Sequence, residues 1–247
     1  MEPKKSSITD MHGAVRVVQT FVCVLALIEF SGCASANYQK ADDASNSLRK
    51  AAIQINGENR AIDVTLATLD NLVNRPAPDL KPQFKSFSKS VDRLAASAKR
   101  AEKAAEVANR KSAEYFRNWD KETAAINFEA VRDQSVSRKT QVSNEFNTVN
   151  QRYRENQAVI EPLISYLQDI RTALSTDLTQ GGLNSVKQLV DNAEQNAHKV
   201  QAALARLTTD LSTSRTEMSS VAPRETQAKG GVSDDTESTQ ERAQSEP

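Results

Sequence analysis

The chain has 247 residues, and its 32 basic side chains balance its 32 acidic ones. This balance leaves no positive excess of the kind that binds nucleic acid or an anionic membrane surface. Only seven glycines and seven prolines occur, and aromatic residues make up 5% of the chain. Such a composition is typical of long helices with a narrow apolar face, so the sequence predicts an all-α protein.

Residues 1–32 have the organisation of a lipoprotein signal peptide. Three basic residues precede an apolar stretch from Val17 to Ile28. A membrane-spanning helix needs about 20 apolar residues, and this stretch is shorter. We therefore expect a cleaved leader rather than a permanent transmembrane helix, with Met1 and Met11 as the two candidate starts.

Cys33 follows the small residues Ser31 and Gly32, as the lipid-attachment cysteine of a bacterial lipoprotein does. We predict that Cys33 is lipidated, with a plain secreted protein or an uncleaved anchor as alternatives. Ala34 stands where, by the sorting rules known for enterobacteria, an aspartate would favour the inner membrane. The predicted location is the outer membrane, with the chain facing the periplasm. Residues 33–37 are expected to form a lipidated N-terminus and short linker.

Residues 38–220 are predicted to form one helical coiled-coil domain. Apolar residues recur there at alternating spacings of three and four, the pattern of a coiled coil rather than of strands. Four segments carry this seam: Tyr38 to Val73, Phe84 to Ile126, Val142 to Leu174 and Val186 to Met218. Each segment is predicted to be one long helix.

Prolines and glycines mark two of the three breaks. A run of three prolines ends the first helix, and Asp79 within it is placed to cap the second. The pair Gly181-Gly182 is predicted to stop the third helix. Pro162, inside the third helix, is expected to kink it or to mark a local break.

The break between the second and third helices has no such mark, because residues 127–140 contain neither Gly nor Pro. Sixteen residues separate Ile126 from Val142, whereas an unbroken seam would give a spacing of about 14, 17 or 18. We predict a turn near 133–137, capped by Ser135 or Ser137. A single helix through this region is the alternative.

Short connections make successive helices antiparallel neighbours. The fold expected is therefore an elongated antiparallel up-down helical bundle, a coiled coil of four long helices. The middle two helices are longer than the outer two, so a two-helix hairpin should protrude. Its tip, around residues 116–150, should lie at the end of the bundle where Cys33 lies.

Four aromatic residues lie near this hairpin: Tyr115, Phe116, Trp119 and Phe128. Aromatic side chains dominate contact surfaces, so these four are the predicted partner or membrane contact. The alternative for Tyr115 and Trp119 is that they fill the seam. The seam also contains two polar residues, Asn59 and Asn156, which are interpreted as setting helix register.

Beyond residue 220 the apolar pattern ends. Residues 221–247 carry three basic and six acidic side chains among many small polar ones, and we predict a disordered acidic tail.

The features of most enzymes are missing from the sequence after the leader. His198 is the one histidine there, so no histidine-rich metal site can form, and it is interpreted as a partly exposed helix residue. Acidic residues alternate with basic ones, as on a solvated helix face. We expect no cofactor, no metal, no nucleic-acid partner and no enzymatic activity.

The chain resembles a family of bacterial lipoprotein-like, predominantly coiled-coil proteins that is defined only as a domain of unknown function. The resemblance covers most of the chain after the leader and implies no functional residues. The proline-rich first turn and the acidic tail depart from the family. The resemblance rests on Tyr115-Phe116-x-x-Trp119-x-x-Glu122, on Glu161-Pro162 with Leu163, Leu167 and Asp169, and on the short break before the last helix.

Three functions follow as hypotheses. The first is a lipid-anchored scaffold or adaptor of the cell envelope, held in the membrane through the lipid on Cys33, with the hairpin tip contacting an unidentified envelope protein or the membrane. The second is a homo-oligomeric collar of a transport or secretion system, whose seam is completed only between copies. The third is an enzyme acting on cell wall or lipid, for which the sequence predicts no cleft.

Overall fold

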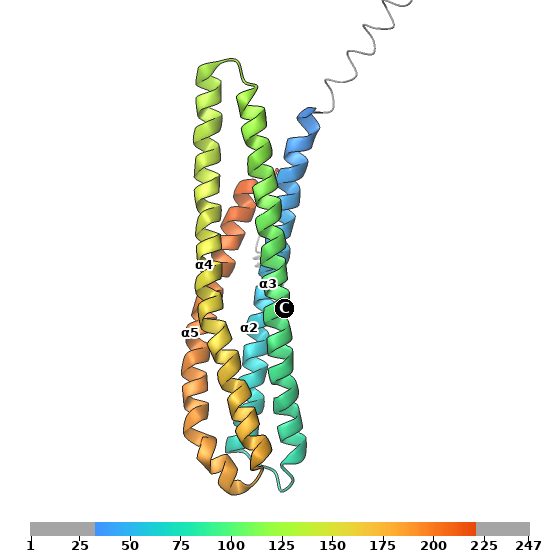
Figure 1. Ribbon diagram of the computed structural model, residues 1–247, viewed down its shortest axis with the longest axis vertical. Helices are drawn as coiled ribbons and strands as arrows, with labels where there is room; N and C mark the ends of the chain where they lie inside the picture. Colours follow the sequence, from blue (N-terminus) through green and yellow to red (C-terminus); the bar gives the residue numbers. More distant parts are fainter. Residues whose placement is uncertain (1–32, 221–247) are drawn as a thin grey trace, which may run out of the picture.

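The computed structural model describes residues 33–220, which fold into four long helices (Figure 1). In chain order these are α2 (Cys33–Asn74), α3 (Lys81–Ala124), α4 (Glu129–Thr176) and α5 (Gln180–Met218). No strand occurs in this part of the chain. The all-α class and the four predicted helices are confirmed. The predicted leader, 1–32, and the predicted tail, 221–247, lie outside the described residues.

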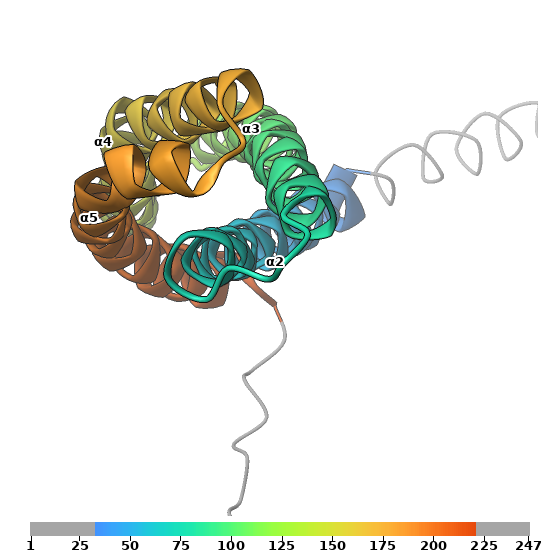
Figure 2. The same ribbon diagram turned by 90° about the horizontal axis from the view of Figure 1, so that it is seen from below.

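The four helices form a ring when viewed along the long axis (Figure 2). Each helix packs against two neighbours, in the order α2, α3, α4, α5 and back to α2. Across residues 33–220 the diagonal pairs, α2 with α4 and α3 with α5, make no close backbone approach. One apolar cluster fills the centre, with members such as Leu48, Phe87, Leu167 and Leu207. The predicted up-down bundle is therefore confirmed, and its seam is buried within a single chain.

The α3–α4 hairpin protrudes from this bundle, as the helix lengths predict. Helices α3 and α4 have 44 and 48 residues, whereas α2 and α5 have 42 and 39. Figure 1 shows the hairpin rising beyond both the start of α2 and the end of α5. The tip and the first residue of α2, Cys33, thus lie at the same end of the rod. Helix α2 already includes residues 33–37, which the sequence analysis assigned to a linker.

The turn at the hairpin tip lies at residues 125–128, so the predicted turn near 133–137 is wrong. Ser135 caps no helix. Its hydroxyl instead accepts the indole N–H of Trp119, at 2.9 Å, and bonds the Thr123 hydroxyl at 2.8 Å, across the hairpin. The turn needs no glycine, because Ala125 is right-handed and Phe128 is extended. For this reason the position of the turn could not be predicted from glycine or proline in the sequence.

The other two turns are fixed by side chains. The Asp79 carboxylate accepts the N–H of Lys81, the first residue of α3, at 3.0 Å. The N-cap position itself is Leu80, so Asp79 lies one residue before the cap position that was predicted for it. At the α4–α5 turn the hydroxyl of Thr179 accepts the N–H of Gly182 at 3.2 Å. Helix α4 has already ended at Thr176, so Gly181 and Gly182 do not stop it as predicted. They belong to the first turn of α5.

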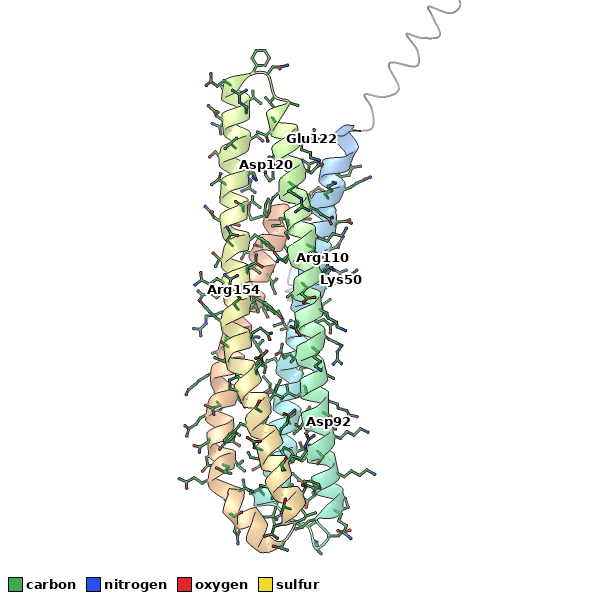
Figure 3. All side chains as sticks on the ribbon, viewed as in Figure 1. Lys50, Asp92, Arg110, Asp120, Glu122 and Arg154 are labelled. Carbon is green, nitrogen blue, oxygen red and sulfur yellow. The ribbon has the colours of Figure 1, made fainter. Side chains whose placement is uncertain are left out.

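Helix α4 is continuous through Pro162. Its upper half is straight, and its axis changes direction below Arg154, which Figure 3 labels. A proline removes one backbone hydrogen bond and crowds the preceding turn, which accounts for a bend without a break.

Gly182 generates a stability prediction. A Cβ atom here would overlap the backbone carbonyl oxygen of Asp177 and lie 3.0 Å from its Cγ. Gly182→Ala should therefore lower the free energy of unfolding by about 1 to 3 kcal/mol, measured by urea denaturation.

Gly181→Ala is the matched control, because its Cβ would meet only the Thr179 hydroxyl, at 3.5 Å. This substitution should change stability by less than about 1 kcal/mol, toward greater stability. Equal effects of the two substitutions would contradict the steric account of the turn.

Candidate functional site

Three of the four predicted contact residues pack inside the base of the hairpin. The ring centroids of Tyr115 and Trp119 lie 5.3 Å apart, and those of Phe116 and Phe146 lie 5.9 Å apart, joining α3 to α4. Tyr115 is only 8% exposed, and Phe116 and Trp119 are half-buried against the apolar cluster. These rings thus fill the widening seam, the alternative that the sequence analysis left open for Tyr115 and Trp119.

Phe128 has the opposite environment. It stands at the turn between α3 and α4, immediately before the first residue of α4, and its side chain is 79% exposed. Val131, three residues later in the first turn of α4, is 57% exposed. The sequence analysis missed Val131, because the turn was placed beyond it. The tip of the rod therefore carries an uncovered apolar side, formed by Phe128 and Val131.

Arg138 links the hairpin to the end of α5 through an ion pair with Glu217. At the next residue along α4, the Lys139 ammonium lies 2.6 Å from the Asp120 carboxylate, joining α4 to α3. Exposed pairs of this kind contribute little free energy each. His198 is exposed, as expected.

A second feature, which the sequence analysis did not identify, is a cavity of about 200 Å³ in the middle of the rod. All four helices line it, and Lys50, Arg110 and Arg154 mark its level in Figure 3. Its wall is mostly apolar, with Leu48, Ile55, Ala108, Phe146, Val149 and Leu207 as principal members. The small side chains of Ala105 and Ala108 on α3 leave part of this space.

Polar residues of α3 and α4 form the rim of the cavity. These are Glu106 and Asn109 on α3, and Asn150 and Arg154 on α4. The Asn150 side-chain amide N–H donates to the side-chain Oδ1 of Asn109 at 3.4 Å, a long hydrogen bond across the opening. The cavity therefore opens between α3 and α4.

Glu58 of α2 is fully buried close to this cavity. Its exposure is 0%, and neither carboxylate oxygen has a hydrogen-bond partner among the described residues. Burial raises the pKa of Glu58 from 4.5 to about 7, because desolvation disfavours the charged form. The sequence analysis placed Asn59 in the seam here. Both positions fit the 3-4 spacing between Ile55 and Ile62, and the structure turns Glu58 to the centre.

Two further polar residues in the interior, Asn156 and Tyr153, lie on α4. Asn156 is 0% exposed, and both atoms of its amide lack a partner among the described residues, so it does face the centre. Tyr153 lines the cavity, and its hydroxyl accepts the Gln157 amide N–H at 3.0 Å. Burial raises the pKa of Tyr153, and the negative charges of Glu102, Glu58, Glu106 and Glu161 raise it further.

The model of a family described as "Protein of unknown function (DUF2959)" matches residues 33–220. No curated protein and no solved structure matches the chain. None of the helices in residues 33–220 is both long and apolar enough to cross a membrane. The same residues contain no group of three or more His, Cys, Asp or Glu side chains that could hold a metal ion.

The buried carboxyl group generates a pH prediction. Because folding raises the pKa of Glu58, the folded state binds the proton more tightly than the unfolded state between pH 4.5 and about 7. Ionisation of Glu58 therefore costs stability that is absent below pH 4.5, grows through this window and is constant above it. Glu58→Gln should be more stabilising at pH 8 than at pH 4.5 by about 3 kcal/mol.

Urea denaturation at the two pH values measures this difference. Glu102→Gln, on an exposed face of α3, is the control and should change stability by less than about 0.5 kcal/mol at either pH. The burial account of Glu58 would be wrong if Glu58→Gln had the same effect at both.

Proposed function

The chain belongs to the DUF2959 family, a membership that assigns no activity, and we propose that the protein is a lipid-anchored scaffold or adaptor of the cell envelope. In this proposal Cys33 carries the lipid, the chain faces the periplasm from the outer membrane, and the rod has no catalytic role. The observation that carries the proposal is the common end shared by Cys33 and the exposed hairpin tip.

The start of α2 supports the anchoring part of the proposal. Helix α2 is continuous from Cys33 to Asn74. A lipid on Cys33 would therefore be joined to the rod without an intervening loop, and it would hold that end of the bundle at the membrane surface. Since the hairpin rises beyond the start of α2, Phe128 and Val131 would then face the membrane or a protein at its surface.

The length of the rod supports the scaffold part of the proposal. A helix rises about 1.5 Å per residue, so the 48 residues of α4 span about 70 Å. Ion pairs and hydrogen bonds bind neighbouring helices along this length, as between Arg171 and Asp92 at 2.6 Å, and between Gln201 and Asp63 at 2.6 Å. Such a rod can hold a partner at a fixed distance from the membrane.

The collar hypothesis gains no observation of its own. It required a seam completed between copies, whereas residues such as Ile62, Leu94, Leu163 and Val200 are buried within one chain.

The enzyme hypothesis would need a site that activates a nucleophile or a proton transfer. Among the described residues, Glu58 is the one carboxyl group whose pKa is strongly raised by burial. No second acid or base is hydrogen-bonded to it.

The tip can be tested by crosslinking in cells. A photoreactive residue in place of Asn127 should form a specific adduct with an envelope protein or a lipid. Adding Phe128→Ser and Val131→Ser should abolish that adduct, because the apolar side of the tip is lost, while helicity stays unchanged.

Val64→Ser is the matched control, since Val64 is 49% exposed on the side of α2, away from the tip. It should leave the adduct intact. An adduct that survives the double substitution at the tip would remove the tip from the proposal.

A further inference from the structure

Contacts between the helices fix the height of Cys33 along the rod. The Asp43 carboxylate on α2 and the Lys111 ammonium on α3 form an ion pair at 3.4 Å, which places these two residues at about the same height. Ten residues separate Asp43 from Cys33, so α2 rises about 15 Å between them. The start of α2 therefore lies about 15 Å from the ion pair, toward the hairpin tip.

The hairpin rises farther from the same ion pair. Between Lys111 and Thr123, α3 rises about 18 Å. The Thr123 and Ser135 hydroxyls lie 2.8 Å apart, so these two residues of α3 and α4 have the same height. From Ser135 to Phe128 the chain rises about 10 Å more. Phe128 thus lies on the order of 10 Å beyond Cys33, and Figure 1 shows the hairpin turn beyond the start of α2.

That reach matches the polar layer of a membrane. A bilayer is about 40 to 45 Å thick with its head groups and its hydrocarbon core is about 30 Å thick, so each polar layer measures about 5 to 8 Å. A lipid on Cys33 would hold the start of α2 at this layer. With the rod upright, a side chain about 10 Å farther along would cross the head groups and meet the acyl chains.

The exposed residues of the tip fit a shallow insertion. Phe128 is 79% exposed and Val131 is 57% exposed. Asn127 and Glu129, on either side of Phe128, are exposed polar residues. Polar side chains and unpaired backbone groups are costly in hydrocarbon, so they would keep the backbone of the turn among the head groups. Apolar side chains alone would enter the boundary of the acyl chains.

The charge of the tip excludes electrostatic attraction as the cause of such a contact. Residues 120–133 carry four acidic and two basic side chains. An anionic membrane surface would repel this excess of acid. Contact with lipid would therefore depend on the burial of apolar side chains, and it should not require anionic lipids.

The tip is too narrow to form a stable protein interface of its own. A helix with its side chains is about 10 to 12 Å across, so the end of a two-helix hairpin covers about 200 to 300 Å². A stable protein–protein interface buries about 800 Å² on each partner. A bilayer sets no such minimum, because an inserted apolar side chain is stabilised in proportion to the area that it buries.

We propose that Phe128 inserts into the lipid bilayer next to the anchor and holds the rod upright on the membrane. This inference rests on the proposed function, because it requires Cys33 to lie at the membrane surface. It identifies a lipid bilayer, rather than a protein, as the partner of the tip. The rod then has two attachments at one end, and the second one fixes an orientation that the lipid alone leaves free.

Fluorescence quenching on vesicles tests the insertion. The full chain carrying Cys23→Ser, produced without lipid, is coupled through the Cys33 thiol to a maleimide lipid in phosphatidylcholine vesicles. Bromine atoms in the acyl chains of the phosphatidylcholine quench a tryptophan that reaches them. Trp119 is the one tryptophan of the chain, so the parent chain gives the background emission. Phe128→Trp should add emission that the brominated lipid quenches about twofold, with the helical circular dichroism spectrum retained.

Val136→Trp is the matched control. Val136 is 48% exposed on the same hairpin and lies eight residues from Phe128, about 12 Å farther from the tip. The emission that this substitution adds should be quenched less than about 1.2-fold, because the position stays outside the acyl chains. Anionic phosphatidylglycerol in the vesicles should not increase the quenching of the Phe128→Trp variant.

Absence of quenching in the tethered Phe128→Trp variant would overturn the inference. Equal quenching at positions 128 and 136 would also overturn it, because the rod would then lie flat on the membrane. A crosslink from position 127 to a protein alone in cells would overturn the insertion and leave the scaffold proposal in place. The tether replaces the natural lipid, so a natural chain without lipid on Cys33 would remove the anchor from the proposed function without changing this readout.

Discussion

One apolar seam, shared by four helices, supports the whole rod. Isolated helices gain most of their stability by packing their apolar side, and burial of residues such as Leu48, Leu94, Leu167 and Leu204 at the common centre supplies the driving force. The seam also fixes the ring order of the helices, because each must present one side to the centre. Wherever the seam changes character, at the tip and at the middle, the chain has a candidate for function.

At the middle of the rod the seam contains polar groups whose burial lowers the stability of the fold. Glu58 and Asn156 are fully buried without partners among the described residues, which opposes the stability that their apolar neighbours supply. Each lies three residues beyond a residue that lines the cavity, Ile55 on α2 and Tyr153 on α4. At the tip, the seam ends in rings that fill the hairpin, and Phe128 lies beyond them in the open.

The sequence predicted what depends on periodicity and failed where two positions fit equally. The four helices and the protruding hairpin follow from spacing and helix length. The hairpin turn was missed because Ala125 to Phe128 adopt it without glycine or proline. Glu58 was missed because Asn59 satisfies the same spacing, and only packing decides which residue turns inward. Gly182 was misassigned because its role, a close approach to Asp177, is a three-dimensional contact.

The common end of Cys33 and Phe128 matters for function only if Cys33 is the anchor. The intact mass of the N-terminal peptide from the outer-membrane fraction tests this directly. The account predicts a chain that begins at Cys33 and carries a diacylglycerol-derived modification, which Cys33→Ser abolishes. An unmodified chain that retains residues 1–32 would contradict it, and the hairpin tip would then have no membrane to face.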